Sequence, residues 1–435
     1  MKPKKSSLHR VFPNTNVAAY YDPLSQIITL SKYNAADFKE LDLATFDSKN
    51  IEKRVLFEHE FTHWLDHVST LWGQKSIASI YNALNARAIG KIEEFWRMKS
   101  LFTNFGSDNF FHYFTEEYEH PENPKTPWRY QITSGIRFSH TGMPEYNKPI
   151  LFLRFNCADN LPLIRVPLSV ASILESNAIY AEFFLKIMMT KSIEDAVERN
   201  LKLKKIQEEW LSILYDKDFA LYTVIAHLTS NLNNQSEVSF TYEISAGIGT
   251  IILNLPDEIF AKMETVKIKI DEWDRRIKEF QNINDKGFGY YNLLKNYIDK
   301  GGQNKYSLED ILSSSNLPQK EKLEEIIIEE MQANKHLLID GPFKEMAITL
   351  IDKGIEIFKI RGIDGKNKDF RQKLLDSDFF PKLIFGDTIF DDTNFNISTI
   401  LKKLNSGEKL SLEEHYLCFD FYDSKFNEFI NACGI

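Results

Sequence analysis

The sequence predicts an α+β fold that is mainly helical, with a small N-terminal β-sheet followed by an α-helical accessory region. Three observations predict it. Short runs of β-branched and aromatic residues lie near the N-terminus, segments with apolar residues at helical spacing follow, and helical periodicity takes over from about Pro256. We therefore expect a first domain over residues 1–255 and an α-helical accessory or regulatory region over residues 256–435.

The first predicted element is a pair of short strands within residues 17–31. Tyr20 and Tyr21 precede the dipeptide Asp22-Pro23, and the run from Ile27 to Leu30 follows it. Tyr, Ile and Thr favour extended backbone, and Asp-Pro is typical of a turn. The pattern predicts two strands joined by a turn.

The next element is a helix that contains most of the candidate site. One apolar stripe at helical spacing comprises Phe57, Phe61, Trp64, Leu65, Val68, Leu71 and Trp72. A second stripe, roughly opposite, comprises His59, His63, Asp66 and His67. Two stripes of this kind predict a helix whose histidines share one side.

Within this helix, His59-Glu60-Phe61-Thr62-His63 is an H-E-x-x-H motif. Two histidines four residues apart project from the same helical face and can bind one metal ion. Glu60 is placed to act as general base on a water at that metal. The alternative interpretation is a pair of hydrogen-bonded histidines on a partly exposed helix.

With its motif helix and preceding strands, the chain resembles the zincin metallopeptidases. The resemblance implies one zinc ion per chain and a small sheet whose edge strand aligns an extended substrate peptide. The extension typical of metzincins is absent, because Asp66 and Ser69 stand where that pattern has Gly and His. His67 lies about 12 Å along a continuous helix from His59, so we expect it behind the ligands or on the surface.

A catalytic zinc needs a third protein ligand, and Glu175 is the first candidate, as in glutamate-ligand zincins (gluzincins). Residues 166–185 have a helical apolar stripe, Pro167 suits a helix start, and the small residues after Glu175 allow close helix packing. The alternative role for Glu175 is a capping box with Ser172. The alternative candidates for the third metal ligand are Glu93 and Glu94. Ile179 stands where those families have an acid, so the candidates for orienting a ligand histidine are Asn177, Asp66 and Glu182.

A donor to a developing oxyanion is also expected, and the sequence leaves it open. The candidates are His140, Arg165, Tyr180, His227 and Tyr242. Ordinary packing or surface roles are the alternative for each of them.

The remaining elements place the candidate ligand after a strand and the accessory helices after position 255. Residues 148–155 predict a third strand, and the polar residues 116–127 predict a surface loop. Beyond Pro256 we expect a helix over residues 259–273, breaks at Gly301-Gly302 and Gly341-Pro342, and an amphipathic helix over 321–330. His336 and His415 are isolated, and we expect structural or surface roles for both.

Composition and sequence patterns argue against several classes of function. The formal net charge of −9 disfavours general nucleic-acid binding. The N-terminus lacks the apolar core of a signal peptide, and no apolar run is long enough to span a bilayer. The three cysteines, Cys157, Cys418 and Cys433, are odd in number and lack metal-type spacing, which fits a reducing cytoplasm.

The motif and its resemblance together predict an intracellular zinc-dependent metalloendopeptidase that cuts a specific protein substrate, with Glu60 as general base and His59, His63 and Glu175 as metal ligands. The alternative is a non-enzymatic sensor or scaffold with a zincin-like fold. In either case the helical C-terminal half is a candidate surface for a protein partner.

Overall fold

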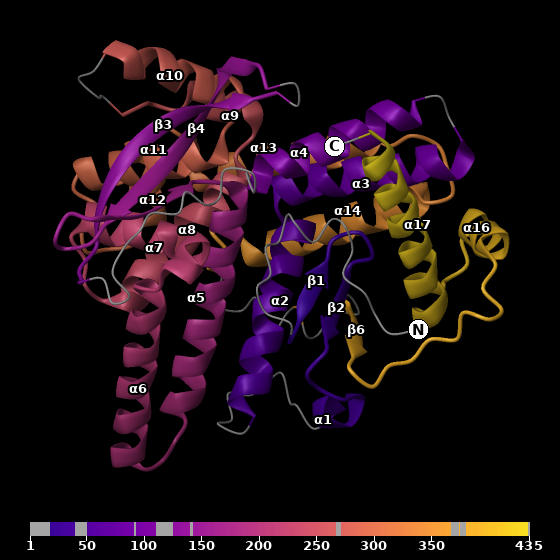
Figure 1. The fold of residues 1–435 in the computed structure, drawn as a ribbon, viewed down its shortest axis with the longest axis horizontal. Helices are drawn as coiled ribbons and strands as arrows, with labels where there is room; N and C mark the ends of the chain where they lie inside the picture. The colour runs from indigo at the N-terminus through magenta and orange to yellow at the C-terminus, as the bar shows by residue number, and fades with distance from the viewer. Residues whose placement is uncertain are drawn as a thin grey trace. The chain divides into compact units, whose positions relative to one another are not determined.

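The structure is a computed structural model that describes residues 18–39, 50–90, 93–109, 125–139, 142–266, 271–366, 374 and 380–433. Over these ranges the chain is mainly helical with two small three-stranded sheets (Figure 1), which confirms the predicted α+β, mainly helical class. It forms two compact units: a first unit of residues 1–107, 327–362 and 366–435, and a second of residues 108–326 and 363–365. The predicted domain boundary after residue 255 stays a prediction.

The sheet of the first unit contains β1 (Tyr20–Asp22), β2 (Ile27–Leu30) and β6 (Lys382–Phe385), in the order β1-β2-β6. The two predicted strands are confirmed, and they pair antiparallel around the predicted turn. The Asp22 carboxylate accepts hydrogen bonds from the amides of Leu24 and Ser25, which closes that turn. The third strand, β6, pairs parallel with β2 and was not predicted.

The motif segment forms α2 (Ile51–Ser69), and α3 (Leu71–Ile89) follows it directly. Thr70 adopts an extended backbone between them, and its hydroxyl accepts from the amide of Gly73, so it caps α3. The predicted stripe is therefore wrong at its end, since Leu71 and Trp72 belong to the second helix. The described part of α2 beyond Phe57 is buried on nearly every side, not on one stripe.

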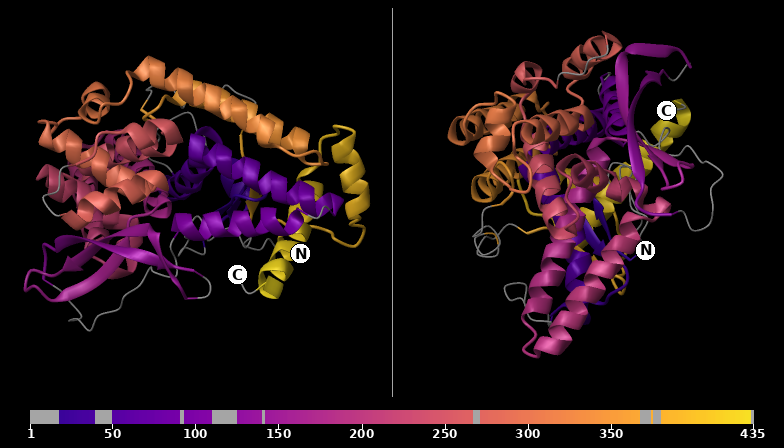
Figure 2. Two further views of the ribbon diagram at one scale, coloured as in Figure 1. Left: turned by 90° about the horizontal axis from the view of Figure 1, so that it is seen from above. Right: turned by 90° about the vertical axis from the view of Figure 1, so that its left-hand side faces the viewer.

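The other elements of the first unit are α1 (Ala35–Lys39), α4 (Glu94–Asn109), η4 (Asn334–Leu337), α14 (Lys344–Arg361), α16 (Ile397–Asn405) and α17 (Leu412–Cys433). Helix α14 lies along α2 and α3 (Figure 2). Gly354 makes this possible, because a Cβ there would stand 1.9 Å from the carbonyl oxygen of Val68. Sequence-distant helices thus support the motif helix.

The second unit contains an antiparallel sheet of β3 (Arg129–Phe138), β4 (Pro144–Asn156) and β5 (Pro162–Pro167). The predicted strand at 148–155 lies within β4, whereas β3 and β5 were not predicted. The predicted loop at 116–127 lies mostly outside the described residues. Helices α10 (Asp271–Asn282) and α7 (Ala220–Asn233) contact this sheet through β4 and β5.

Helix α5 (Val170–Lys191) is the centre of the helical part of the second unit and packs on α7 and on α8 (Val238–Asn254). It begins at Val170, because Ser169 and Ser172 form a reciprocal capping box. The prediction that Pro167 starts the helix is wrong, since Pro167 ends β5. The capping interpretation of Glu175 is also wrong, because Glu175 lies beyond the first turn.

The remaining helices are α6 (Ala196–Leu214), η3 (Lys217–Phe219), α9 (Asp257–Lys262), α11 (Lys286–Asp299), α12 (Leu308–Ser314) and α13 (Lys320–Ala333), which belongs to the first unit from Ile327 onwards. Figure 1 shows α5 and α6 as an antiparallel pair. The helix predicted over 259–273 is wrong, because α9 ends at Lys262 and Met263 is extended. The predicted breaks at Gly301-Gly302 and Gly341-Pro342 and the helix over 321–330 are confirmed. Among the described helices none has the length and apolar character needed to cross a membrane.

Candidate metal centre

The two motif histidines face one another on α2. Their Nε2 atoms are 3.1 Å apart and their ring planes are inclined at 87°. Two nitrogen ligands of one tetrahedral zinc ion, each about 2.0–2.1 Å from it, stand about 3.3 Å apart. The observed separation fits shared coordination, and it also fits an N–H···N hydrogen bond between two neutral imidazoles.

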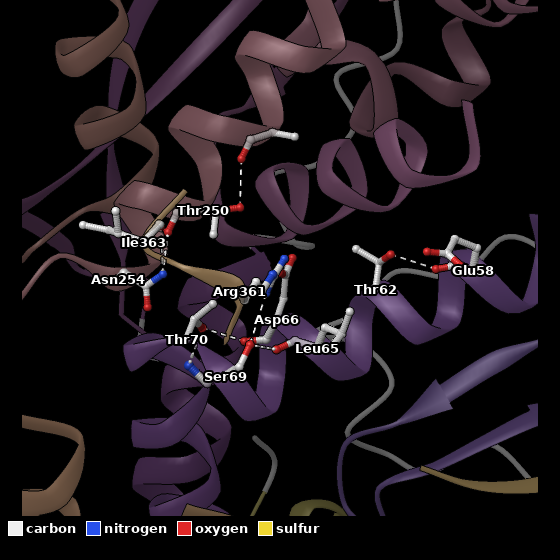
Figure 3. A network of polar contacts seen from close by, with 12 residues as sticks. Glu58, Thr62, Leu65, Asp66, Ser69, Thr70, Thr250, Asn254, Arg361 and Ile363 are labelled. Carbon is white, nitrogen blue, oxygen red and sulfur yellow. Dashed lines mark hydrogen bonds and ion pairs between the residues drawn. The ribbon is translucent and has the colours of Figure 1, made fainter. Parts of the chain in front are cut away.

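Glu60 is buried, with 2% of its surface exposed, and it follows His59 directly on α2. The same stretch is fixed by apolar packing: the Phe61 ring stacks on the rings of Phe57 and Trp64. The Thr62 hydroxyl donates to the Glu58 carbonyl 2.8 Å away (Figure 3). This buried hydroxyl therefore finds its hydrogen-bond acceptor within its own helix. The backbone that carries the three functional side chains is therefore ordered by local contacts.

Glu175 lies in α5 and is fully buried. The small residue Gly249 of α8 lies beside this stretch, since a Cβ there would stand 2.8 Å from Oδ1 of Asn177. Glu175 belongs to the second unit, and the two motif histidines, His59 and His63, belong to the first. These are the three predicted ligands, and their ligand role stays a prediction.

The two alternative candidates for the third metal ligand, Glu93 and Glu94, lie at the start of α4 (Glu94–Asn109). Glu93 is exposed and precedes α4, where it lines a cavity of about 320 Å³ with Trp96 and Arg97. Glu94 is the first residue of α4, and its side chain lies outside the described residues.

His67 is fully buried, so the surface role predicted as one of its two possibilities is wrong. Its Nδ1 lies 2.7 Å from the Tyr21 hydroxyl and its Nε2 lies 3.0 Å from the Ser76 hydroxyl. Burial lowers the pKa of His67 to about 3, so the ring is neutral at physiological pH. This neutral ring joins β1, α2 and α3.

Asp66, one of the predicted orienting residues, forms a buried ion pair. Its Oδ1 lies 2.6 Å from Nη2 of Arg361, the last residue of α14, and Asp66 is fully buried (Figure 3). Of the other two candidates, Asn177 is buried and Glu182 is half-buried, both on α5. Neither the residue type nor the spacing in the sequence had indicated that Arg361 pairs with Asp66.

The structure describes four of the five candidate oxyanion donors, and their role stays a prediction. His227 stacks on Trp128, and burial lowers its pKa to about 4, while its Nε2 bonds the Leu214 carbonyl. Tyr242 is buried in an apolar cluster with Trp210. Burial raises the pKa of Tyr180 to about 12. His140 lies outside the described residues.

The guanidinium of Arg165 lies over the Phe152 ring, 4.2 Å from its centroid. The two isolated histidines have the roles expected: His336 is exposed, and the buried His415 bonds the Ser25 carbonyl at 2.7 Å. All three cysteines are free, with Cys157 and Cys418 buried.

Comparisons of the chain with protein-family models, with curated proteins and with solved structures return no match. The zincin resemblance therefore depends on the motif and its surroundings.

Proposed function

We propose that this chain is an intracellular zinc-dependent metalloendopeptidase of the zincin type, which hydrolyses peptide bonds of a specific protein substrate. The observation that carries the proposal is the pair of facing imidazoles, with Nε2 atoms 3.1 Å apart, together with the buried Glu60 that follows His59 directly in the sequence. A purely structural metal site has no use for an adjacent base.

In this proposal His59, His63 and Glu175 would hold one zinc ion, and two His with one Glu are a donor set typical of catalytic zinc. A bound zinc ion supplies Lewis acidity to the scissile carbonyl and to the attacking water. Glu60 takes the proton of that water at its carboxylate and gives it to the leaving amine. Because Glu60 is buried, its side chain is shielded from bulk water.

Binding of an extended peptide is supported by the sheet of the first unit. Within the described residues β1 is an edge strand of the β1-β2-β6 sheet, and both β1 and β2 contact α2. An edge strand can pair with a substrate main chain without reading its side chains. Selection of one protein target would then come from surfaces outside the strand, for which the helical C-terminal half is the candidate.

The test of the proposed activity is Glu60→Gln, which keeps the size of the side chain and removes its basicity. We expect the variant to bind zinc like the wild type and to lose cleavage of a peptide library, with a fall in rate of at least a hundredfold. Glu52→Gln, on the exposed first turn of the same helix, is the matched control and should cleave normally.

The peptidase proposal is wrong if two results are found together. The wild type binds zinc but cleaves nothing, and cells that carry Glu60→Gln have the same phenotype as cells that carry the wild type. The alternative of a non-enzymatic sensor or scaffold then stands.

A further inference from the structure

The C-terminal half of α2 carries a buried ion pair one turn beyond the second motif histidine. Asp66 follows His63 by three positions, and its side chain is 0% exposed. Its partner Arg361, at the end of α14, is 8% exposed and also donates from Nη1 to the Ser69 hydroxyl at 3.3 Å. One guanidinium thus holds two positions on successive turns of the motif helix.

Stability alone does not account for such a pair. Removing two charges from water costs about as much as their attraction returns, and apolar residues of similar size serve a core equally well. What a guanidinium provides is direction, because its donors are fixed in one plane. Asp66 and Ser69 are therefore held at defined positions relative to α14.

The backbone of the same turn is held by further contacts. The hydroxyls of Ser69 and Thr70 donate to the carbonyls of Leu65 and Asp66. The Gln74 amide donates to the Val68 carbonyl at 2.5 Å and lies 3.5 Å from the Ile351 carbonyl of α14. The helix ends directly after this turn, at a place where an unsupported helix would fray.

His63 belongs to the turn that these contacts hold, since in an α-helix the amide of residue 67 bonds the carbonyl of residue 63. A shift of the last turn therefore moves the His63 ring relative to His59. We propose that Arg361, acting through Asp66 and Ser69, is a positioning residue that keeps the two imidazoles at the separation needed for metal binding. This inference rests on the proposed metal site.

The test compares metal affinity in full-length variants that differ in the pair. Arg361→Met alone would leave a buried charge, so the main variant combines Arg361→Met with Asp66→Leu, which keeps an apolar core. Arg361→Lys keeps the charge and loses the planar fork. Lys353→Gln removes an exposed ion pair on the same helix and is the matched control.

Zn²⁺ and Co²⁺ dissociation constants are measured by titration, with the absorption spectrum of bound Co²⁺ as a readout of coordination and thermal melting as a readout of folding. We expect the double variant to melt within a few degrees of the wild type and to bind either metal at least tenfold more weakly, with an altered Co²⁺ spectrum. Arg361→Lys should bind with intermediate affinity, and Lys353→Gln like the wild type.

Unchanged affinity and spectrum in a folded double variant would overturn the inference. If the double variant does not fold, Arg361→Lys decides, because wild-type affinity in that variant shows that the planar fork is not needed. A wild type that binds neither metal would overturn the proposed function instead, so the two failures are distinct.

Discussion

Gly354→Ala tests the close packing of α14 on the motif helix. An added Cβ would stand 1.9 Å from the Val68 carbonyl oxygen and 2.0 Å from Nε2 of Gln74. Real Cβ contacts essentially never fall below 3.0 Å, so α14 must move away from α2 by roughly 1 Å. Overpacking of this kind costs about 1–3 kcal/mol, and loss of the Gln74 hydrogen bond adds about 1 kcal/mol.

The higher helix propensity of Ala offsets about 1 kcal/mol, so we expect a net loss of about 2 kcal/mol. The assay is urea unfolding followed by tryptophan fluorescence, since Trp64 and Trp72 are buried on α2 and α3. Gly106→Ala is the matched control, because a Cβ in that helix would meet nothing within 4 Å. That variant should be unchanged or slightly stabilised, and the same result for Gly354→Ala would refute the packing.

Two further predictions concern buried polar groups. Burial lowers the pKa of His415 to about 3, below the unfolded value of 6.5, so the unfolded chain binds the proton more tightly and stability is lost as pH falls through this window. His415→Gln can still donate to the Ser25 carbonyl but does not take up this proton. Between pH 7.5 and pH 5 the variant should therefore lose about 2 kcal/mol less unfolding free energy than the wild type, measured by chemical denaturation. The same pH profile in both proteins would contradict this. The Tyr242 hydroxyl is buried with no hydrogen-bond partner among the described residues, so Tyr242→Phe should raise the unfolding free energy by about 1 kcal/mol. A loss of stability would show that the hydroxyl is bonded, and a selective loss of cleavage would make Tyr242 the oxyanion donor.

Local patterns in the sequence were sufficient for the elements that carry the candidate ligands. The β-favouring residues around Asp22-Pro23 predicted β1 and β2, and the helical stripes predicted most of α2 and α5, because these signals lie within about twenty residues. The helix break at Thr70 was missed, although Thr is one of the residues preferred at the N-cap of a helix. The start of α5 was missed for the same reason at Ser169.

Long-range partners could not be predicted from one sequence. Asp66 finds its arginine 295 positions later, and His67 finds Tyr21 46 positions earlier. Strand β6 likewise joins β2 across most of the chain, in a parallel pairing that no turn signal announces. The stripe of His and Asp residues on α2 gave no indication of these partners, although Asp66 and His67 are fully buried.

The zinc content per chain tests the proposed metal site directly, and it is measured by elemental analysis of protein purified without added metal, for the wild type, His63→Ala and Glu175→Gln. Circular dichroism of each sample establishes that the variants are folded. We expect one zinc ion per wild-type chain and a marked loss of zinc in both variants. A folded wild type that holds no zinc even after reconstitution would contradict this expectation.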